Sequence, residues 1–208
     1  VVFDGTTQNL TSGGVDAGHD FVNLTITGTT AVTLVTNALV VTGNLTTAAT
    51  TDSLDIGALA LTAGVLVHTG NIILIGSQTV TVTTPDINSG TFTYNGTGTY
   101  AIVAPIATYY NLTFNGNAGS WTFNAALDVN NALTVTLGTV VLGANSDVDG
   151  AVAVASDAAA TLNIATYQLN VAGAWSVGAL GVFTAGAGST VVFDGTTQNL
   201  TSGGVDAG

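Results

Sequence analysis

The chain of 208 residues holds no Lys, Arg or Cys, and its twelve acidic residues, all Asp, give a formal net charge of −12. This composition rules out disulfides and ordinary salt bridges, and it argues against binding to nucleic acids or anionic lipid surfaces, which needs basic side chains. Hydrophobic residues make up 47% of the chain, enough to fill a long core, so stability must come from apolar burial and backbone hydrogen bonds.

The first eighteen residues, VVFDGTTQNLTSGGVDAG, return letter for letter at residues 191–208. The sequence therefore closes on itself, with Val191 in the place of Val1. We interpret residues 1–190 as one full period of a tandem array and residues 191–208 as the start of the next, identical period.

From Phe21 onward, short runs rich in Val, Ile, Leu and Thr are separated by Gly, Asn, Asp or Ser, a pattern that predicts strands joined by turns. The segment AVAVASDAAATL at 151–162 has some helical character, but its alternating Val residues favour a strand. The predicted strand regions are 21–27, 31–36, 38–47, 53–64, 64–68, 71–76, 78–84, 90–95, 109–116, 120–129, 132–144, 151–156, 160–173 and 181–186.

Weaker internal copies divide the period into two related halves, about 1–89 and 90–190. Residues 21–26 (FVNLTI) align with residues 109–114 (YYNLTF) at an offset of 88, and Leu45 then aligns with Leu133. Leu54 aligns with Leu162 at an offset of 108. Conservation of residue type between these segments indicates a stack of related units.

The expected fold class is all-β, a parallel β-solenoid (β-helix) built from tandem repeats with about 20 residues per coil. In such a fold, the Thr, Asn and Val runs stack in ladders and the apolar face of each strand points into one core. At about 4.8 Å per coil, one period corresponds to a rod segment of roughly 45 Å. The alternative is an array of antiparallel β-sandwich domains.

The pattern V-x-F-x-G-T-x-Q-x-L-x-S-G within residues 181–204, followed by F-x-N-L-T-I at residues 21–26, resembles the β-strand repeats of giant bacterial and archaeal cell-surface proteins and adhesins. A degenerate copy lies at residues 90–114. The resemblance implies a parallel β-helix at the cell surface and no shared catalytic residues. The complete absence of Lys and Arg departs from many such proteins.

Two groups of polar residues are tentative Ca²⁺ ligands, because this ion prefers oxygen donors. Asn145, Asp147 and Asp149 form the first, and Asp16 and Asp20, with His19 between them, form the second. Neither has the spacing of an EF-hand loop or of a glycine-rich nonapeptide repeat, and for any single Asp the role of a solvated turn residue is the preferred interpretation. Calcium is therefore the one cofactor considered, and no zinc site is expected.

Carboxylate pairs also raise the question of glycoside hydrolysis. The candidates are Asp147 with Asp149, and Asp52 with Asp55. Neither pair has a neighbouring His, and no Lys or Arg is present to hold acidic sugars, so we predict that the protein is not an enzyme and has no catalytic residues. His68 is expected at the surface or in a turn.

Eight of the fourteen aromatic residues lie between Phe92 and Phe123. Those that alternate with Thr or Asn are predicted to stack in the core: Phe92, Phe114 and Phe123. Neighbours on a regular strand face opposite sides, so one residue of the Tyr109–Tyr110 pair must face outward. The tentative contact residues for glycans or a neighbouring rod are Tyr94, Tyr109, Tyr110 and Trp121.

The sequence as a whole predicts a structural repeat unit of an extracellular fibre, stalk or surface coat. Its partner would be the protein itself, in end-to-end or lateral assembly, since propagation pairs the strand edges that otherwise aggregate. No membrane span is expected in this segment. The alternative function is the shaft of a cell-surface adhesin that binds glycans or a neighbouring cell.

Overall fold

Parallel β-strands form the secondary structure in the computed structural model of the chain, which describes residues 1–13, 21–102, 106–157 and 159–203. These residues contain no helix and make about nine turns of a β-solenoid. The predicted fold class is therefore confirmed, and the antiparallel sandwich alternative is wrong, because the strand pairs described below are parallel. The chain divides into two units, Val1–Thr93 and Tyr94–Gly208.

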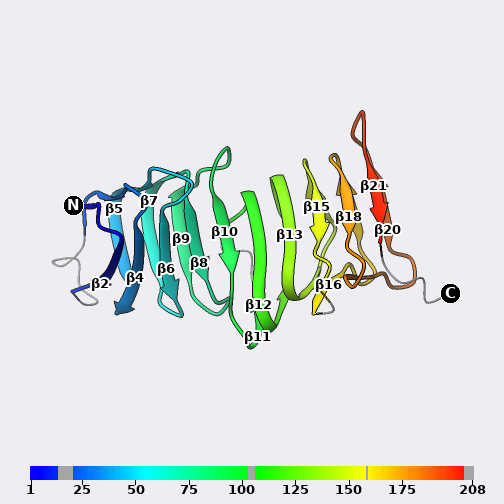
Figure 1. The fold of residues 1–208 in the computed structure, drawn as a ribbon, viewed down its shortest axis with the longest axis horizontal. Helices are drawn as coiled ribbons and strands as arrows, with labels where there is room; N and C mark the ends of the chain where they lie inside the picture. Colours follow the sequence, from blue (N-terminus) through cyan, green and yellow to red (C-terminus); the bar gives the residue numbers. More distant parts are fainter. Residues whose placement is uncertain (14–20, 103–105, 158, 204–208) are drawn as a thin grey trace. The chain divides into compact units, whose positions relative to one another are not determined.

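In the first unit, two sets of strands alternate along the chain and stack side by side (Figure 1). One set has the order β1-β3-β5-β7-β9 and the other runs β2-β4-β6-β8-β10. The bounds are β1 Val2–Phe3, β2 Thr7–Thr11, β3 Leu24–Ile26, β4 Ala31–Thr36, β5 Leu39–Thr47, β6 Ser53–Gly57, β7 Leu61–His68, β8 Asn71–Leu74, β9 Val80–Thr84 and β10 Thr91–Tyr94.

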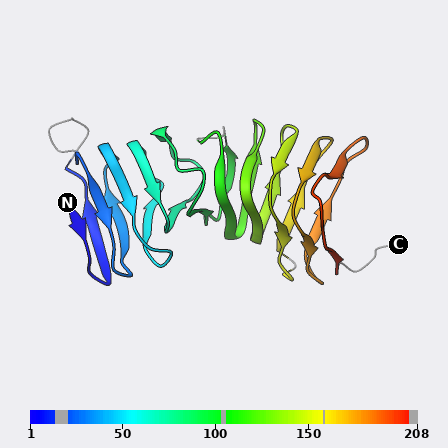
Figure 2. The ribbon, with the colours of Figure 1, turned by 90° about the horizontal axis from the view of Figure 1, so that it is seen from above.

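In the second unit, one long strand shows how a coil is built (Figure 2). Strand β13 pairs in succession with β14, β15 and β16, so a single strand bends around two corners. Gly138 has a φ of 89° at one bend, which glycine adopts without strain. The bounds are β11 Thr99–Ile102, β12 Tyr109–Phe123, β13 Asp128–Val141, β14 Ser146–Val148, β15 Val152–Val154, β16 Ala160–Asn163, β17 Gln168–Val171, β18 Trp175–Val177, β19 Val182–Thr184, β20 Thr190–Phe193 and β21 Leu200–Ser202.

The core of each unit consists of columns in which residues of successive coils pair directly. In the first unit, Leu24 pairs with Leu45 and Leu45 with Leu66. All three are buried, and burial of each such side chain contributes about 2 kcal/mol. In the second unit, Val129 pairs with Val148 in the same way, and both are fully buried. The alternation of apolar and polar residues therefore places one face of every strand in the core.

Segments whose sequences align make equivalent pairings in the two units. Leu24 pairs with Leu45 in the first unit, and Leu112 pairs with Leu133 in the second. The pair Val32 and Leu54 likewise corresponds to Val140 and Leu162, at the same sequence offset that relates Leu54 to Leu162. The weak internal similarity thus marks coils with the same role, while the period of residues 1–190 stays a prediction.

The number of residues per coil varies around the predicted value. A short coil joins Leu54 to its partner Ile72, and a long one joins Trp175 to its partner Leu200. Loops and β-bulges absorb this variation, since register shifts interrupt several strand pairs, among them β5 with β7, β6 with β8 and β12 with β13. The segment 151–162 forms β15 and part of β16, as its alternation predicts.

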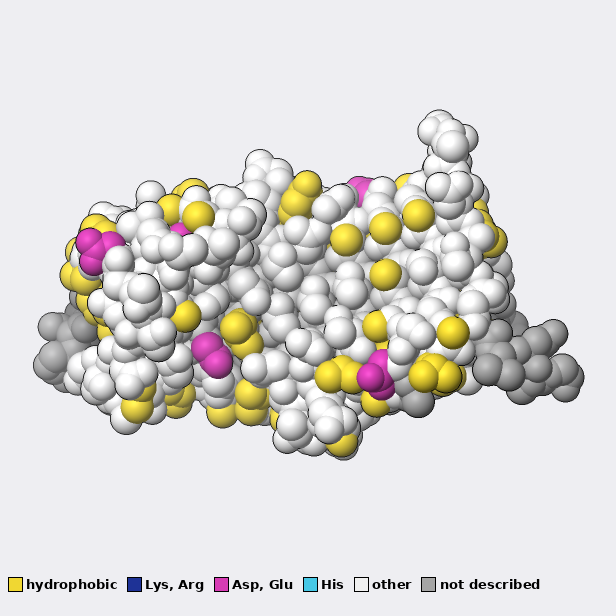
Figure 3. All heavy atoms as spheres, viewed as in Figure 1, with side chains coloured by type: hydrophobic (Ala, Val, Ile, Leu, Met, Phe, Trp, Pro, Cys, Tyr) yellow, Lys and Arg dark blue, Asp and Glu magenta, His cyan; other side chains and the backbone are white. Residues whose placement is uncertain are grey.

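On one face of the molecule, neither acidic nor hydrophobic side chains gather into a large patch (Figure 3). On the face drawn in Figure 3, the hydrophobic side chains form separate spots and the acidic side chains lie singly. No basic residue is available to neutralise them. Singly scattered hydrophobic residues are normal for a protein surface and carry no functional signal.

Candidate functional site

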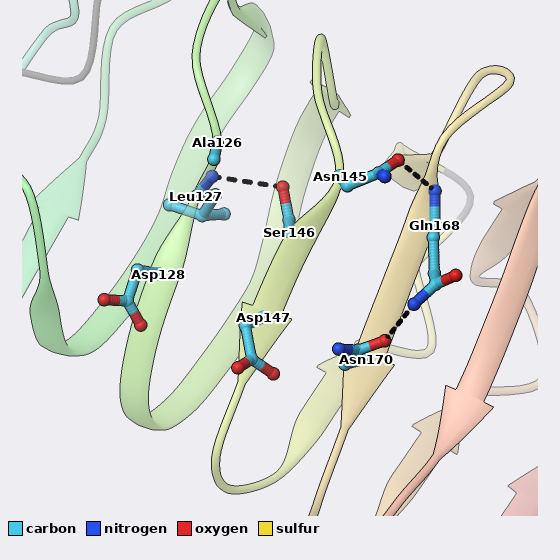
Figure 4. Close-up of a pocket in the computed structure, with 8 residues that line it drawn as sticks. All are labelled: Ala126, Leu127, Asp128, Asn145, Ser146, Asp147, Gln168 and Asn170. Atoms are coloured by element: carbon cyan, nitrogen blue, oxygen red, sulfur yellow. Dashed lines mark hydrogen bonds between the residues drawn. The ribbon is translucent and has the colours of Figure 1, made fainter.

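A surface hollow of about 180 Å³ lies over β13, β14 and β17 in the second unit (Figure 4). We call it the acidic groove, because two Asp side chains and three amide side chains line it. It is open to solvent and has no deep interior, so it suits a small polar ligand or an ion better than a buried substrate. The lining residues are Ala126, Leu127, Asp128, Asn145, Ser146, Asp147, Gln168 and Asn170.

Strand register brings the central polar residues of the acidic groove together. Asp128 pairs with Asp147, and Asp147 pairs with Asn170, so the three form a column across three coils. Their sequence neighbours Val129, Val148 and Val171 are fully buried, and alternation therefore turns the polar side chains outward. Neighbouring strands lie about 4.8 Å apart, which sets the spacing of the column.

Hydrogen bonds already occupy several polar atoms of the acidic groove. The Ser146 hydroxyl accepts from the Leu127 N–H and donates to the Ala144 carbonyl, both at 3.1 Å. The Asn145 Oδ1 accepts from the Gln168 N–H at 2.9 Å. Ser146 is therefore engaged on both sides and has no base positioned to make it a nucleophile.

The side chains at the rim are also held in place. The Gln168 Nε2 donates to the Asn170 Oδ1 at 2.7 Å, and the Thr108 hydroxyl donates to the Asp128 Oδ2 at 2.7 Å. Asp147 stands between Asp128 and Asn170 in the column. The register thus places two carboxylates on adjacent coils, side by side.

Burial raises the pKa of the Asp147 carboxyl, and three other carboxylates raise it further: Asp149, Asp194 and Asp128, in that order. A hydrogen bond from the backbone of Val148 lowers this pKa by less than these effects raise it. A raised pKa means that the charged form is disfavoured at this position. The acidic groove therefore favours the binding of protons or cations. It has no Lys or Arg side chain to balance the charge of an anionic ligand.

The predicted calcium ligands are brought together only in part. Asn145 and Asp147 line the same groove, whereas Asp149 does not line it. Within the described ranges, no three acidic, His or Cys residues are placed to hold a metal ion together. Asp16, His19 and Asp20 lie outside the described residues.

Asp52, one of the carboxylates considered for catalysis, is a fully buried corner residue. Its Oδ1 accepts from the Thr30 N–H at 3.0 Å, and its Oδ2 accepts from the Ala49 N–H at 2.8 Å. These bonds satisfy backbone donors at a turn between strands. Asp55 similarly accepts from the Gly57 N–H at 2.9 Å, so both carboxylates serve the backbone.

His68 is buried with 1% exposure, so the prediction of a surface or turn position is wrong. Its Nε2 lies 2.8 Å from the Thr91 carbonyl oxygen, and its Nδ1 lies 2.9 Å from the Thr47 hydroxyl. Because a carbonyl only accepts, Nε2 carries the proton and Nδ1 accepts from Thr47. The Thr47 oxygen in turn accepts from the Gly70 N–H at 2.9 Å.

Burial disfavours the charged form of this histidine. Burial lowers the pKa of His68, while the bond to Thr91 and the Asp86 charge raise it by less. Asp86 accepts from the His68 backbone N–H at 2.8 Å. The sequence signal was present, because His68 follows Leu66 at an interval of two and thus shares its inward face.

Three of the four tentative contact residues are interior. Tyr94, Tyr109 and Trp121 have 1% exposure or less. They cannot reach a ligand while the coils stay closed, so we do not assign them a contact role. Tyr110 is half-buried and faces away from Tyr109, as strand alternation predicts. The predicted core positions of Phe92, Phe114 and Phe123 are confirmed.

Comparison of the chain with family models, with curated proteins and with solved structures finds no match. The parallel solenoid therefore rests on the pairing of this chain's own strands. Within the part of the chain that the structure describes, no helix has the length and apolar character to cross a membrane.

Proposed function

We propose that this chain is a non-enzymatic structural repeat unit of an extracellular fibre, stalk or surface coat. The observation that carries the proposal is the parallel ladder that joins successive coils within each unit, with fully buried apolar columns behind it. Such a ladder spreads a mechanical load over many backbone hydrogen bonds. The buried polar residues Asp52 and His68 bond backbone groups at corners, which suits a structural role.

Assembly follows from the same geometry. Each strand of a parallel stack offers donors and acceptors on two edges, and an added coil satisfies the edge that would otherwise be open. The protein itself is thus the partner whose shape and hydrogen bonds fit best. Solenoid stability grows as neighbouring units are added, because each interface contributes.

The acidic surface fits an exposed position. A net charge of −12 without any Lys or Arg keeps separate rods apart in solution and leaves trypsin no cleavage site. Cations reduce the repulsion along a rod, with the largest effect at low ionic strength. The adhesin alternative loses most of its proposed contact surface, since only Tyr110 of the four aromatic candidates is accessible.

Electron microscopy of the purified chain and of chains with several consecutive periods tests the proposal. We expect rods whose length grows by a constant step per period, near the roughly 45 Å set by the coil spacing. Compact particles whose length does not grow with the number of periods would contradict the structural function. Surface labelling of the producing cells with an antibody against the repeat tests the extracellular location.

A further inference from the structure

The repeated sequence occupies two different positions in the stack. In its first copy, β1 and β2 pair with the coil that follows, through β3 and β4. In its second copy, β20 and β21 pair with the coil that precedes, through β17 and β18. The structure therefore gives the strand partners of this sequence on both of its edges: the following coil in the first copy and the preceding coil in the second copy.

The pairings of the two copies place the Phe of the repeated sequence in the same core column. Val171 pairs with Phe193 in the second copy, and the equivalent Phe3 pairs with Ile26 in the first copy. Val171 and Ile26 are both fully buried. A coil placed between them would align Val171, the shared Phe and Ile26 in one inward column.

The second column agrees as well. Trp175 pairs with Leu200 in the second copy, and the equivalent Leu10 pairs with Leu34 in the first copy. Trp175, Leu10 and Leu34 are buried, with exposures of 7%, 5% and 5%. The registers on the two edges are thus compatible, since each places the same Leu beside an interior residue.

The exposed fraction of the same Leu differs between the two copies. Leu200 is 61% exposed, whereas the identical Leu10 is 5% exposed. Phe193, in the neighbouring column of the second copy, is 36% exposed. Large apolar side chains at the end of a ladder with an available strand edge are the features of an incomplete interface.

We propose that residues 191–203 form a coil shared by two consecutive copies of the sequence within one polypeptide. Residues 21–36 of the following copy would pair with its second edge, in the register that β3 and β4 use for β1 and β2. This inference deepens the proposed structural function and rests on it for the existence of consecutive copies. It specifies the partner segment and the residues that meet.

Chain connectivity favours a following copy in the same polypeptide over a separate molecule. In the sequence, residues 1–18 precede residues 21–36, and the identical residues 191–208 would precede the same segment of a following copy. A separate molecule would first have to release its own residues 1–13 from β3 and β4. That release loses as many strand pairings as the new contact forms.

Engineered cysteines in a two-copy chain, residues 1–190 followed by 1–208, test the register. Val192→Cys is combined with Thr25→Cys in the following copy, because the equivalent Val2 pairs with Thr25. Thr201→Cys is combined with Ser176→Cys in the preceding copy, because Ser176 pairs with Thr201. The chain has no Cys of its own, and strands about 4.8 Å apart meet the distance that a disulfide needs. We expect both disulfides in one and the same chain, because the shared coil pairs on both of its edges, and at least tenfold slower oxidation of the first pair when Thr27→Cys replaces Thr25→Cys.

Hydrogen exchange gives a second readout that needs no substitution. The amides of residues 191–202 between the two copies should exchange at least a hundredfold more slowly than the same amides at the end of the single-copy chain, residues 1–208. Unchanged exchange, or chains that form only one of the two disulfides, would overturn the shared coil. Disulfides between separate single-copy chains carrying Val192→Cys and Thr25→Cys would overturn the single-polypeptide arrangement.

These outcomes are distinct from failure of the structural function. A two-copy chain can show the disulfides and the protection while surface labelling finds no extracellular protein. That result would retain the shared coil and remove the proposed location. Rods of the expected length without the disulfides would support the structural function and contradict the shared coil.

Discussion

The two units share one type of ladder but fill their interiors differently. In the first unit, polar residues at the corners are buried and hydrogen-bonded, among them Thr30, Thr47, Asp52 and His68. The second unit instead has a cluster of aromatic side chains inside its coils. The comparison shows that the ladder tolerates both interiors, since the buried polar residues Thr30, Thr47, Asp52 and His68 have hydrogen-bond partners.

The aromatic cluster is tightly connected. The Phe114 ring lies 5.2 Å from the Trp121 ring and 5.8 Å from the Phe123 ring, measured between centroids, and it stacks on Tyr94 at 5.3 Å. The Tyr94 and Tyr109 hydroxyls lie 3.1 Å apart. Burial raises the pKa of Tyr94 to about 12, so its hydroxyl stays neutral and able to hydrogen-bond.

Removal of the largest aromatic side chain should have the largest effect. Trp121→Ala leaves a cavity among Tyr94, Phe114 and Tyr100, and we expect it to lower the free energy of unfolding by about 3–5 kcal/mol. Urea denaturation followed by circular dichroism measures the change. Tyr110→Ala, in the same unit but at the half-buried position, should change it by less than about 1 kcal/mol; equal losses would contradict the assigned interior.

A polar corner of the first unit should be nearly as sensitive. Asp52→Ala removes the acceptor of the Thr30 and Ala49 N–H groups, and we expect a loss of about 2–3 kcal/mol because these donors lose their partner. Urea denaturation checks this value. Asp4→Ala, at an exposed position, serves as the control, and a similar loss there would show that charge, and not hydrogen bonding, matters.

Acidification should weaken the first unit through His68. Burial lowers the pKa of His68 below its ordinary 6.5, so the unfolded chain takes up the proton at a higher pH than the folded chain. The free energy of unfolding should therefore fall as the pH drops below about 6.5, until the lowered folded pKa is reached. Thermal unfolding between pH 8 and 5 measures this slope.

The variant His68→Gln provides the comparison for this pH dependence. Glutamine cannot take up a proton in this range, so the slope between pH 6.5 and 5 should become smaller even if the variant is less stable at pH 8. Asp86 does not contribute to this slope, because it takes up its proton only at a lower pH. Burial raises its pKa, but hydrogen bonds from His68, Asn88 and Ser89 outweigh burial and lower the pKa below 3.8. An unchanged slope in His68→Gln would exclude His68 as the source.

The smallest effect is expected in the acidic groove. Asp147→Asn removes the carboxylate opposite Asp128, and we expect a gain of about 0.5 kcal/mol at pH 7 and low salt. Since the folded pKa of Asp147 is raised, the carboxylate destabilises the fold above that pKa, and the gain should vanish as the pH falls toward 3.8. Thermal unfolding at two ionic strengths measures it. A loss of stability would contradict the repulsion.

Much of the fold was predictable, because alternation and repetition are local properties of the sequence. The runs around Leu24, Leu45 and Leu66 predict inward-facing strands, and repetition at about 20 residues predicts their stacking. The interior positions of Phe92, Phe114 and Phe123 followed in the same way. The acidic groove was predictable only in part, since Asn145 and Asp147 are close in sequence but Gln168 and Asn170 belong to another coil.

The sequence by itself determined the strand content and the inward face of the apolar runs, because these depend on period-two alternation, and it determined that residues 1–18 recur exactly at residues 191–208. It did not determine that His68, Tyr94 and Trp121 lie inside. Tertiary structure decided which distant residues meet. The length of each individual coil sets the pairing of Asp128 with Asp147 and of Trp175 with Leu200. Hydrogen bonds across coils made Asp52 and His68 buried corner residues, because a backbone donor or acceptor in the interior requires a partner that only the folded chain provides.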